Sequence, residues 1–133
     1  MSKKISVMLV DDNKIDLFIH HELIRQMDIA HTIAECPFAT EALKFLEEHD
    51  ANSWPDIILL DIHMPVMNGF DFLDKYALLP EELRSKCRII AVSSSLDTGD
   101  KLRANESPMV LQLLEKPLNT TKLRNLLQSE KVI

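Results

Sequence analysis

Three carboxylates and a lysine stand directly after apolar runs in this chain of 133 residues. Asp11 and Asp12 follow the first run, Asp61 follows the third, and Lys116 follows the fifth. Three carboxylates in one crevice would repel each other, and a hard divalent cation with oxygen ligands, such as Mg²⁺, relieves that repulsion. A carboxylate beside such an ion can attack phosphorus, and an ammonium group offsets charge on the phosphoryl oxygens. The residue types therefore predict a Mg²⁺-dependent phosphoryl-accepting site centred on Asp61.

Hydroxyl groups follow the fourth apolar run, at Ser93, Ser94 and Ser95. Ser93 is best placed to donate to a further phosphoryl oxygen, and no general base is required because a carboxylate is already ionised at neutral pH. Taken one at a time, a strand-end Asp is usually a cap or turn former, and a Lys before Pro usually lies at the surface. Their joint occurrence at matching positions favours a site by roughly ten to one.

Five short apolar runs predict the strands that must position these groups. The second run is the least apolar and suits an edge strand, whereas the third and fourth are apolar at every position, as in a parallel sheet covered on both faces. Strands alternating with helices imply right-handed crossovers and a doubly wound sheet, with ligands bound beyond the carboxyl ends of the strands. The predicted strands are Ile5–Val10, Thr32–Glu35, Asp56–Leu60, Arg88–Val92 and Met109–Glu115.

Helical periodicity fills the intervals between the strands. One predicted helix buries a face made of Ile15, Phe18, Ile19, Leu23 and Met27. Further helices are predicted over Thr40–Leu46 and Phe70–Leu78, around Leu123–Leu127 with a cap at Asn119 or Thr120, and, as an extra polar stretch, within Pro80–Cys87. The segment after Ser95 should form only a weak helix, ended by Pro108.

Composition bounds the class of protein. The net charge of −6 argues against binding nucleic acid through its phosphates and against a polybasic membrane role. Cys36 and Cys87 are read as thiols in a reducing compartment. The N-terminal apolar stretch is too short for a signal peptide, and no run approaches transmembrane length. The expectation is one cytoplasmic domain over residues 1–133 with no output domain.

Four sequence motifs carry a family resemblance. They are Val10-Asp11-Asp12, the stretch Leu60 to Phe70 with the pattern Asp-x-x-Met-Pro-x-Met-x-Gly, Ile90-Ala91-Val92-Ser93-Ser94, and Glu115-Lys116-Pro117. In this order the motifs resemble the receiver domain of bacterial two-component response regulators, of the stand-alone type, over almost the whole chain. The resemblance implies a flavodoxin-like α/β fold with strand order 2-1-3-4-5 and helices on both faces.

The resemblance also implies roles for the acidic residues. Asp61 would be the phosphoacceptor, Asp12 a direct Mg²⁺ ligand, and Asp11 a ligand acting partly through water. The backbone carbonyl of His63 would be the third protein ligand. The His63 side chain would either flank the phosphoryl group and tune its hydrolysis or simply lie at the surface, and the sequence leaves both readings open.

Three further positions concern the conformational switch. By resemblance, Ser93 is the hydroxyl that moves onto the phosphoryl group, and Lys116 pairs with Asp61 and then with the phosphoryl oxygens. The Lys116-Pro117 bond should be cis. Leu113 stands where the family usually has an aromatic residue, so this chain departs from the version of the switch that rotates an aromatic ring.

The resulting functional hypothesis is a signalling phosphoacceptor rather than a turnover enzyme. A sensor histidine kinase or a histidine phosphotransfer protein would supply the phosphoryl group. Output would pass to a partner protein through the surface formed by the fourth helix (after Ser95), the fifth strand and the final helix. The alternatives are a haloacid-dehalogenase-type phosphatase, which would usually carry Asp at the position of His63, a flavodoxin-like nucleotide binder, for which a Gly-rich loop is lacking, and a receiver that docks without being phosphorylated.

Overall fold

The computed structural model describes residues 3–94 and 97–133, and its centre is one parallel sheet. The strand order is β2-β1-β3-β4-β5, and every neighbouring pair is parallel. The doubly wound fold and its strand order, both expected from the sequence, are therefore confirmed. The strands are β1 (Ile5–Val10), β2 (Ala30–Cys36), β3 (Ile57–Asp61), β4 (Arg88–Ser93) and β5 (Val110–Glu115).

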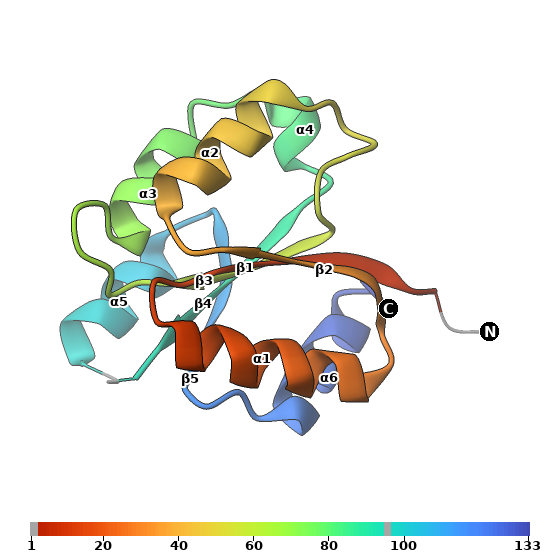
Figure 1. Ribbon diagram of the computed structural model, residues 1–133. Coiled ribbons are helices and arrows are strands. Elements are labelled where there is room, and N and C mark those ends of the chain that lie inside the picture. The colour runs from red at the N-terminus through yellow and green to blue at the C-terminus, as the bar shows by residue number, and fades with distance from the viewer. Residues whose placement is uncertain (1–2, 95–96) are drawn as a thin grey trace.

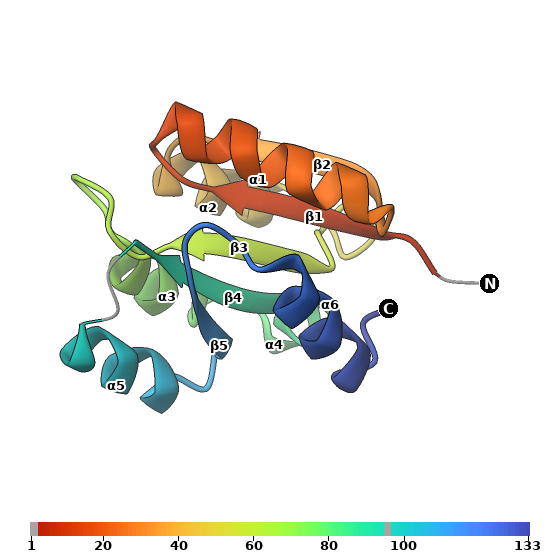
Figure 2. The same ribbon diagram turned by 90° about the horizontal axis from the view of Figure 1, so that it is seen from below.

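Helices cover both faces of the sheet (Figures 1 and 2). Helices α1 and α6 lie on one face, and α2, α3 and α4 lie on the other. Helix α5 joins the second group, since its Ala104 packs into the same core cluster. The helices are α1 (Lys14–Met27), α2 (Ala39–Glu48), α3 (Gly69–Tyr76), α4 (Glu81–Arg84), α5 (Thr98–Glu106) and α6 (Thr120–Ser129).

Burial along the strands follows their place in the sheet. Strand β3, between β1 and β4, is buried at every position. Strand β2 lies at one edge, as predicted for the run Thr32–Glu35, and none of its residues is fully buried. Central parallel strands are covered on both faces and are therefore continuous apolar runs, whereas an edge strand is partly open to solvent.

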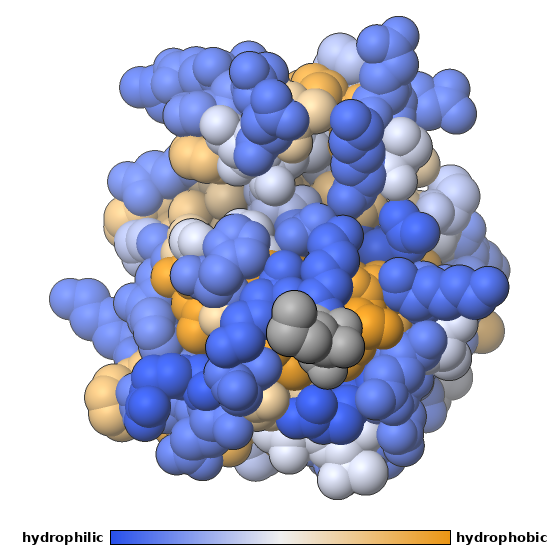
Figure 3. Space-filling model, turned by 90° about the vertical axis from the view of Figure 1, so that its right-hand side faces the viewer, coloured by the Kyte–Doolittle hydropathy of each residue, from blue (hydrophilic) through white to orange (hydrophobic). Residues whose placement is uncertain are grey.

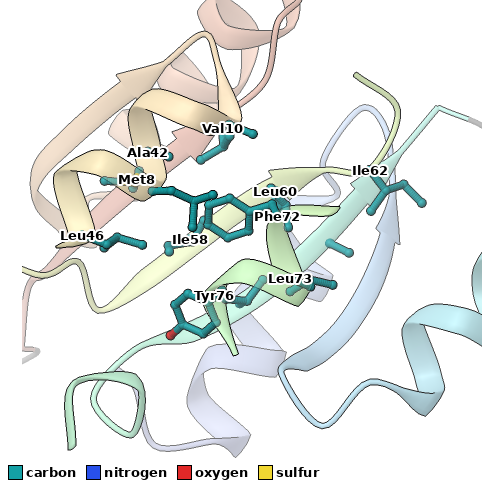
Figure 4. Close-up of a cluster of buried hydrophobic side chains, with 14 of the residues drawn as sticks. Met8, Val10, Ala42, Leu46, Ile58, Leu60, Ile62, Phe72, Leu73 and Tyr76 are labelled. Atoms are coloured by element: carbon teal, nitrogen blue, oxygen red, sulfur yellow. The ribbon is translucent and has the colours of Figure 1, made fainter. Parts of the chain in front are cut away.

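The sheet separates two apolar clusters. On the side of α2 and α3, Met8, Ile58 and Phe72 pack with Leu46 (Figure 4). On the other side, Leu9 and Leu59 pack against α1 and α6. Successive strand residues point to opposite faces, so neighbours such as Met8 and Leu9 enter different clusters. This two-sided packing fixes the register that brings the strand ends level.

The predicted buried face of α1 is wrong in part. Ile15 and Phe18 are 71% and 67% exposed, and Ile19 is also exposed. The helix instead buries Leu17, His20, Ile24 and Met27. Helix α1 has apolar side chains on two adjacent faces, and periodicity alone does not choose between them. The sheet selects the face that carries Leu17 and Ile24.

Helix α5 forms where the sequence predicted a weak helix. The Asp97 side chain caps it by accepting hydrogen bonds from the N–H groups of Gly99 and Asp100. The helix ends at Glu106, just before Pro108, as expected. Among its residues only Ala104 is buried. A good cap therefore starts the helix, but little apolar burial holds it to the sheet.

The outer surface is mostly polar at the amino ends of the strands, where hydrophilic side chains cover most of the visible face (Figure 3). Within the part of the chain that the structure describes, no helix is long and apolar enough to cross a bilayer. Cys36 and Cys87 are both free thiols.

Candidate functional site

The carboxyl ends of β1 and β3 bring the three predicted carboxylates together. One oxygen from each of Asp11, Asp12 and Asp61 lies within 4.8 Å of the others. Asp11 and Asp61 are buried, whereas Asp12 is exposed. The group opens into a cavity of about 400 Å³, which is lined by Asp12, Asn13, Asp16, Asp61, His63, Ser94 and Lys116. It lies at the end of the sheet where α1 begins, on the left in Figure 1.

Asp61 is the last residue of β3, and only 3% of it is exposed. Its Oδ1 accepts a hydrogen bond from the backbone N–H of His63 at 3.0 Å. Burial raises the pKa of Asp61 to about 6, and the neighbouring Asp11 adds to the rise, against the His63 hydrogen bond and the Lys116 charge. Burial and the neighbouring carboxylate therefore both disfavour the ionised form of Asp61.

Lys116 is the ammonium group expected at this site, and its side chain is 9% exposed. Its Nζ lies 2.6 Å from Asp11 Oδ2, 2.9 Å from Asp16 Oδ2 and 3.4 Å from Asp61 Oδ2. Burial lowers the pKa of Lys116, but hydrogen bonds to Asp11 and Asp16 outweigh it, so the net pKa is raised. The lysine is charged, and its two shortest contacts are not with the predicted phosphoacceptor.

The backbone around Lys116 ties β5 to β4. The Lys116 N–H donates to the carbonyl of Ser93 at 2.8 Å. The Lys116-Pro117 peptide bond is cis, as predicted. Ser93 itself is fully buried, while Ser94 is exposed and lines the cavity. Ser95 lies outside the described residues.

Asp16 is the site residue that the sequence did not identify. It is the third residue of α1, and its N–H donates to the side chain of the cap residue Asn13 at 3.1 Å. An Asp three residues after an Asn cap is typical of a helix start, so the pattern gave no reason to expect chemistry. The Asn13 N–H, however, donates to Asp11 Oδ1 at 2.9 Å, and the Asp16 carboxylate meets Lys116 instead.

The start of α3 repeats the same spacing with a different outcome. Asn68 accepts from the Asp71 N–H at 2.9 Å, and Asp71 accepts from the Asn68 N–H at 3.2 Å, which completes a capping box. Gly69, the first residue of α3, lies against the end of β3. A Cβ there would lie 2.7 Å from Ile62 Cα and 2.9 Å from the Asp61 carbonyl oxygen. Glycine is thus required for α3 to pack this close to Asp61.

His63 reaches across to α5. Its Nε2 lies 3.0 Å from Asp100 Oδ2, and the His63 side chain is about half exposed. This contact was not foreseen, because nothing in the sequence relates the loop after β3 to a helix that begins more than thirty residues later. His63 therefore connects the site to α5, while its backbone N–H supports Asp61.

Leu113 lies in β5 at the position where an aromatic side chain is usual in the resembling family. It is half-buried and packs at the margin of the cluster that contains Ala91 and Ala104. Leu113 also lines an open groove between α5, β5 and α6. The branched aliphatic side chain of Leu113 therefore packs where the sheet meets α5.

The oxygen donors of the site suit a divalent cation. Three carboxylates that can each offer one oxygen within 4.8 Å suit a hard cation of the Mg²⁺ type, since oxygen ligands and retained waters are what that ion prefers. The raised pKa of Asp61 points the same way, because a cation would restore the ionised form. The residues present fit Mg²⁺.

Fold and site together are those of a receiver domain of two-component signalling. The model of the response regulator receiver domain matches residues 7–128. The chain belongs to the response regulator receiver family.

Two solved structures resemble the chain over nearly its full length. A two-component response regulator from Cytophaga hutchinsonii superposes with a TM-score of 0.88 at 33% identity, covering 96% of this chain and 97% of that one. A response regulator receiver protein from Dyadobacter fermentans gives 0.86 at 35% identity, covering 93% of this chain and 95% of that one.

The curated relatives are longer proteins. A protein-glutamate methylesterase/protein-glutamine glutaminase of Pseudomonas syringae pv. tomato is 31% identical over 126 residues, covering 94% of this chain and 32% of that protein. Its counterpart in Burkholderia pseudomallei is 30% identical over 102 residues, covering 77% of this chain and 26% of the relative. The chain thus spans between a quarter and a third of the relatives' length.

Proposed function

We propose that this protein accepts a phosphoryl group on Asp61 in a Mg²⁺-dependent reaction and so acts as a signalling switch. The observation that carries the proposal is the geometry around Asp61. A buried carboxylate stands with two further carboxylates within 4.8 Å and an ammonium group at 3.4 Å. A nucleophile, a set of metal ligands and a counter-charge for the phosphoryl oxygens therefore occupy one cavity.

The chemistry follows from those groups. A carboxylate oxygen of Asp61 attacks the phosphorus of a phosphohistidine, forming an O–P bond as the P–N bond breaks. The leaving imidazole nitrogen keeps the electron pair and takes up a proton. The Asp61 carboxylate that reacts is held by the N–H of His63 at 3.0 Å, and Lys116 and the Ser93 hydroxyl would contact the transferred oxygens.

Asp12 and Asp11 would hold the Mg²⁺ together with Asp61 and the backbone carbonyl of His63. When bound, the ion supplies positive charge to the phosphoryl oxygens in the transition state. Asp12 is the exposed member of the group, so it would be the ligand most accessible to an ion from solvent.

The partners follow from the same proposal. The donor is a sensor histidine kinase or a histidine phosphotransfer protein in the cytoplasm. The output partner binds the face formed by α5, β5 and α6, where the structure has an open groove of about 910 Å³. The single buried residue of α5 supports this assignment, because a helix held by few apolar contacts can change position at small energetic cost.

The test is incubation with phosphoramidate, with and without Mg²⁺, followed by intact-mass measurement. One added phosphoryl group is expected, only with Mg²⁺, and none in Asp61→Asn. The matched control is Asp74→Asn, an exposed aspartate on α3, which should be labelled like the wild type. Labelling of Asp61→Asn at the wild-type level would refute the assignment.

Two alternatives predict different outcomes, one in this experiment and one in a phosphomonoester hydrolysis assay. A docking receiver that is never phosphorylated would gain no mass under any condition. A phosphatase of the haloacid-dehalogenase type would hydrolyse a phosphomonoester repeatedly. The position two residues after Asp61 is His63, and its ring pairs with Asp100, so the second carboxylic acid that such a phosphatase uses is not supplied there.

A further inference from the structure

We infer that Asp16 is a positioning residue that competes with the phosphorylated Asp61 for the Lys116 ammonium group. The inference rests on the proposed function and adds to it a residue that sets how readily Lys116 turns toward the phosphoryl oxygens. Asp16 lines the same cavity as Asp61 and Lys116, and its side chain is 29% exposed.

The Lys116 ammonium group lies closer to Asp16 than to Asp61. Lys116 Nζ lies 2.9 Å from Asp16 but 3.4 Å from Asp61. A 2.9 Å contact is a full charge-assisted hydrogen bond, whereas 3.4 Å is an ion pair of weaker geometry. In this state the lysine is therefore drawn toward α1 rather than toward the phosphoacceptor.

The Asp16 carboxylate also differs from Asp71 in its hydrogen bonds at the start of the helix. Its position in α1 matches that of Asp71 in α3, where the carboxylate accepts the N–H of the cap residue. In α1 that N–H belongs to Asn13 and is taken by Asp11 Oδ1. The Asp16 carboxylate is therefore available for another partner, although the Asp16 N–H still donates to Asn13. Its Oδ2 accepts a hydrogen bond from Lys116, one hundred residues away in the sequence.

Asp11, the other close partner of Lys116 at 2.6 Å, is also a predicted metal ligand. If a cation drew on the charge of Asp11, Asp16 would be the carboxylate that continues to hold the lysine. A phosphoryl group on Asp61 would then have to attract Lys116 away from Asp16, so Asp16 opposes the phosphorylated state.

The test measures the affinity for beryllofluoride, a phosphoryl analogue, at saturating Mg²⁺ in Asp16→Asn and in Asp71→Asn. Both changes remove one negative charge from the same helical position and keep the side-chain shape. Asp16→Asn should bind beryllofluoride about fivefold more tightly than wild type, and Asp71→Asn should bind it like the wild type. Equal effects in the two variants, no effect in Asp16→Asn, or weaker binding would each overturn the inference.

Two controls show whether Asp16 acts through the lysine. In a Lys116→Met background, Asp16→Asn should have no further effect, and a persisting gain would mean that the charge acts on the ligand directly. The NMR signal of the Lys116 ammonium, recorded without metal or beryllofluoride, should shift in Asp16→Asn and stay unchanged in Asp71→Asn. If the wild type binds no beryllofluoride, the proposed function fails, and this shift still decides whether Asp16 holds Lys116.

Discussion

The starts of α1 and α3 share the sequence pattern Asn-x-x-Asp but are held in place by different forces. At α1, Asn13 and Asp16 belong to a network of charges that reaches Lys116. At α3, Asn68 and Asp71 close a local capping box, and the backbone packs against β3 at Gly69. Contacts between charges hold the start of α1 in place, and close packing of the backbone holds the start of α3. The identity of the side chains is therefore a poor guide to their task, and the neighbours decide it.

This contrast separates two kinds of sensitivity. Contacts between charges respond to pH, salt and metal ions, while close packing responds to the volume of a single atom. We therefore expect the charge cluster at Asp61 to be the adjustable part of the site and the base of α3 to be its fixed part.

The largest effect is expected for Asp61→Asn in metal-free protein at pH 7.5, which should raise the free energy of unfolding by about 2 kcal/mol. The pKa of Asp61 is raised to about 6 by burial, so ionising it in the folded state costs free energy. The stability linked to the raised pKa of Asp61 is fully present below the pKa of Asp61 in the unfolded chain. It is lost as pH rises through about 6. The gain in Asp61→Asn should therefore disappear as pH falls from 7 toward 4.

Urea unfolding of Asp61→Asn, of the control Asp74→Asn and of wild type over that pH range would measure this. Saturating Mg²⁺ should raise wild-type stability and leave Asp61→Asn less affected. A pH-independent difference between Asp61→Asn and wild type would show that the charge on Asp61 is not the cause.

An effect of about 2 kcal/mol is expected for Gly69→Ala, in the opposite direction. The new Cβ would meet backbone atoms of Ile62 and Asp61 at under 3.0 Å, so α3 or the end of β3 must move. Urea unfolding should show the loss at every pH, in contrast to Asp61→Asn. The control is Gly99→Ala on α5, where the nearest heavy atom is a side-chain oxygen of Asp97 at 3.0 Å, and it should cost less.

The smallest effect is expected for Val66→Gly, in the loop that leads to α3. Val66 is fully exposed and has φ of 68°, a left-handed conformation that is unfavourable for a β-branched residue. Glycine should stabilise the protein by up to about 1 kcal/mol, since the strain removed exceeds the added freedom of the unfolded chain. Thermal unfolding at constant pH would measure it, and destabilisation would indicate that the Val66 side chain has a contact of its own.

Much of the site could be predicted from the sequence because the fold is strongly periodic. Continuous apolar runs located β3 and β4, and the residues after them had to lie at one edge of the sheet. Asp11, Asp12, Asp61 and Lys116 were therefore expected together, and the structure brings them together. The buried face of α1 could not be chosen in the same way, since Ile15 and Phe18 fit helical spacing as well as Leu17 and Ile24 do.

What the sequence determined by itself is the position of the strands along the chain and the set of groups at their ends, since both follow from local periodicity and from the geometry of parallel crossovers. The order of the strands in the sheet was implied by the family resemblance. What only the tertiary structure decided is which of those groups meet. Asp16 and Asp71 occupy the same position in the same local pattern, yet only Asp16 faces Lys116. The physical reason is that the strength of a charge contact depends on distance through space, and sequence spacing does not fix that distance.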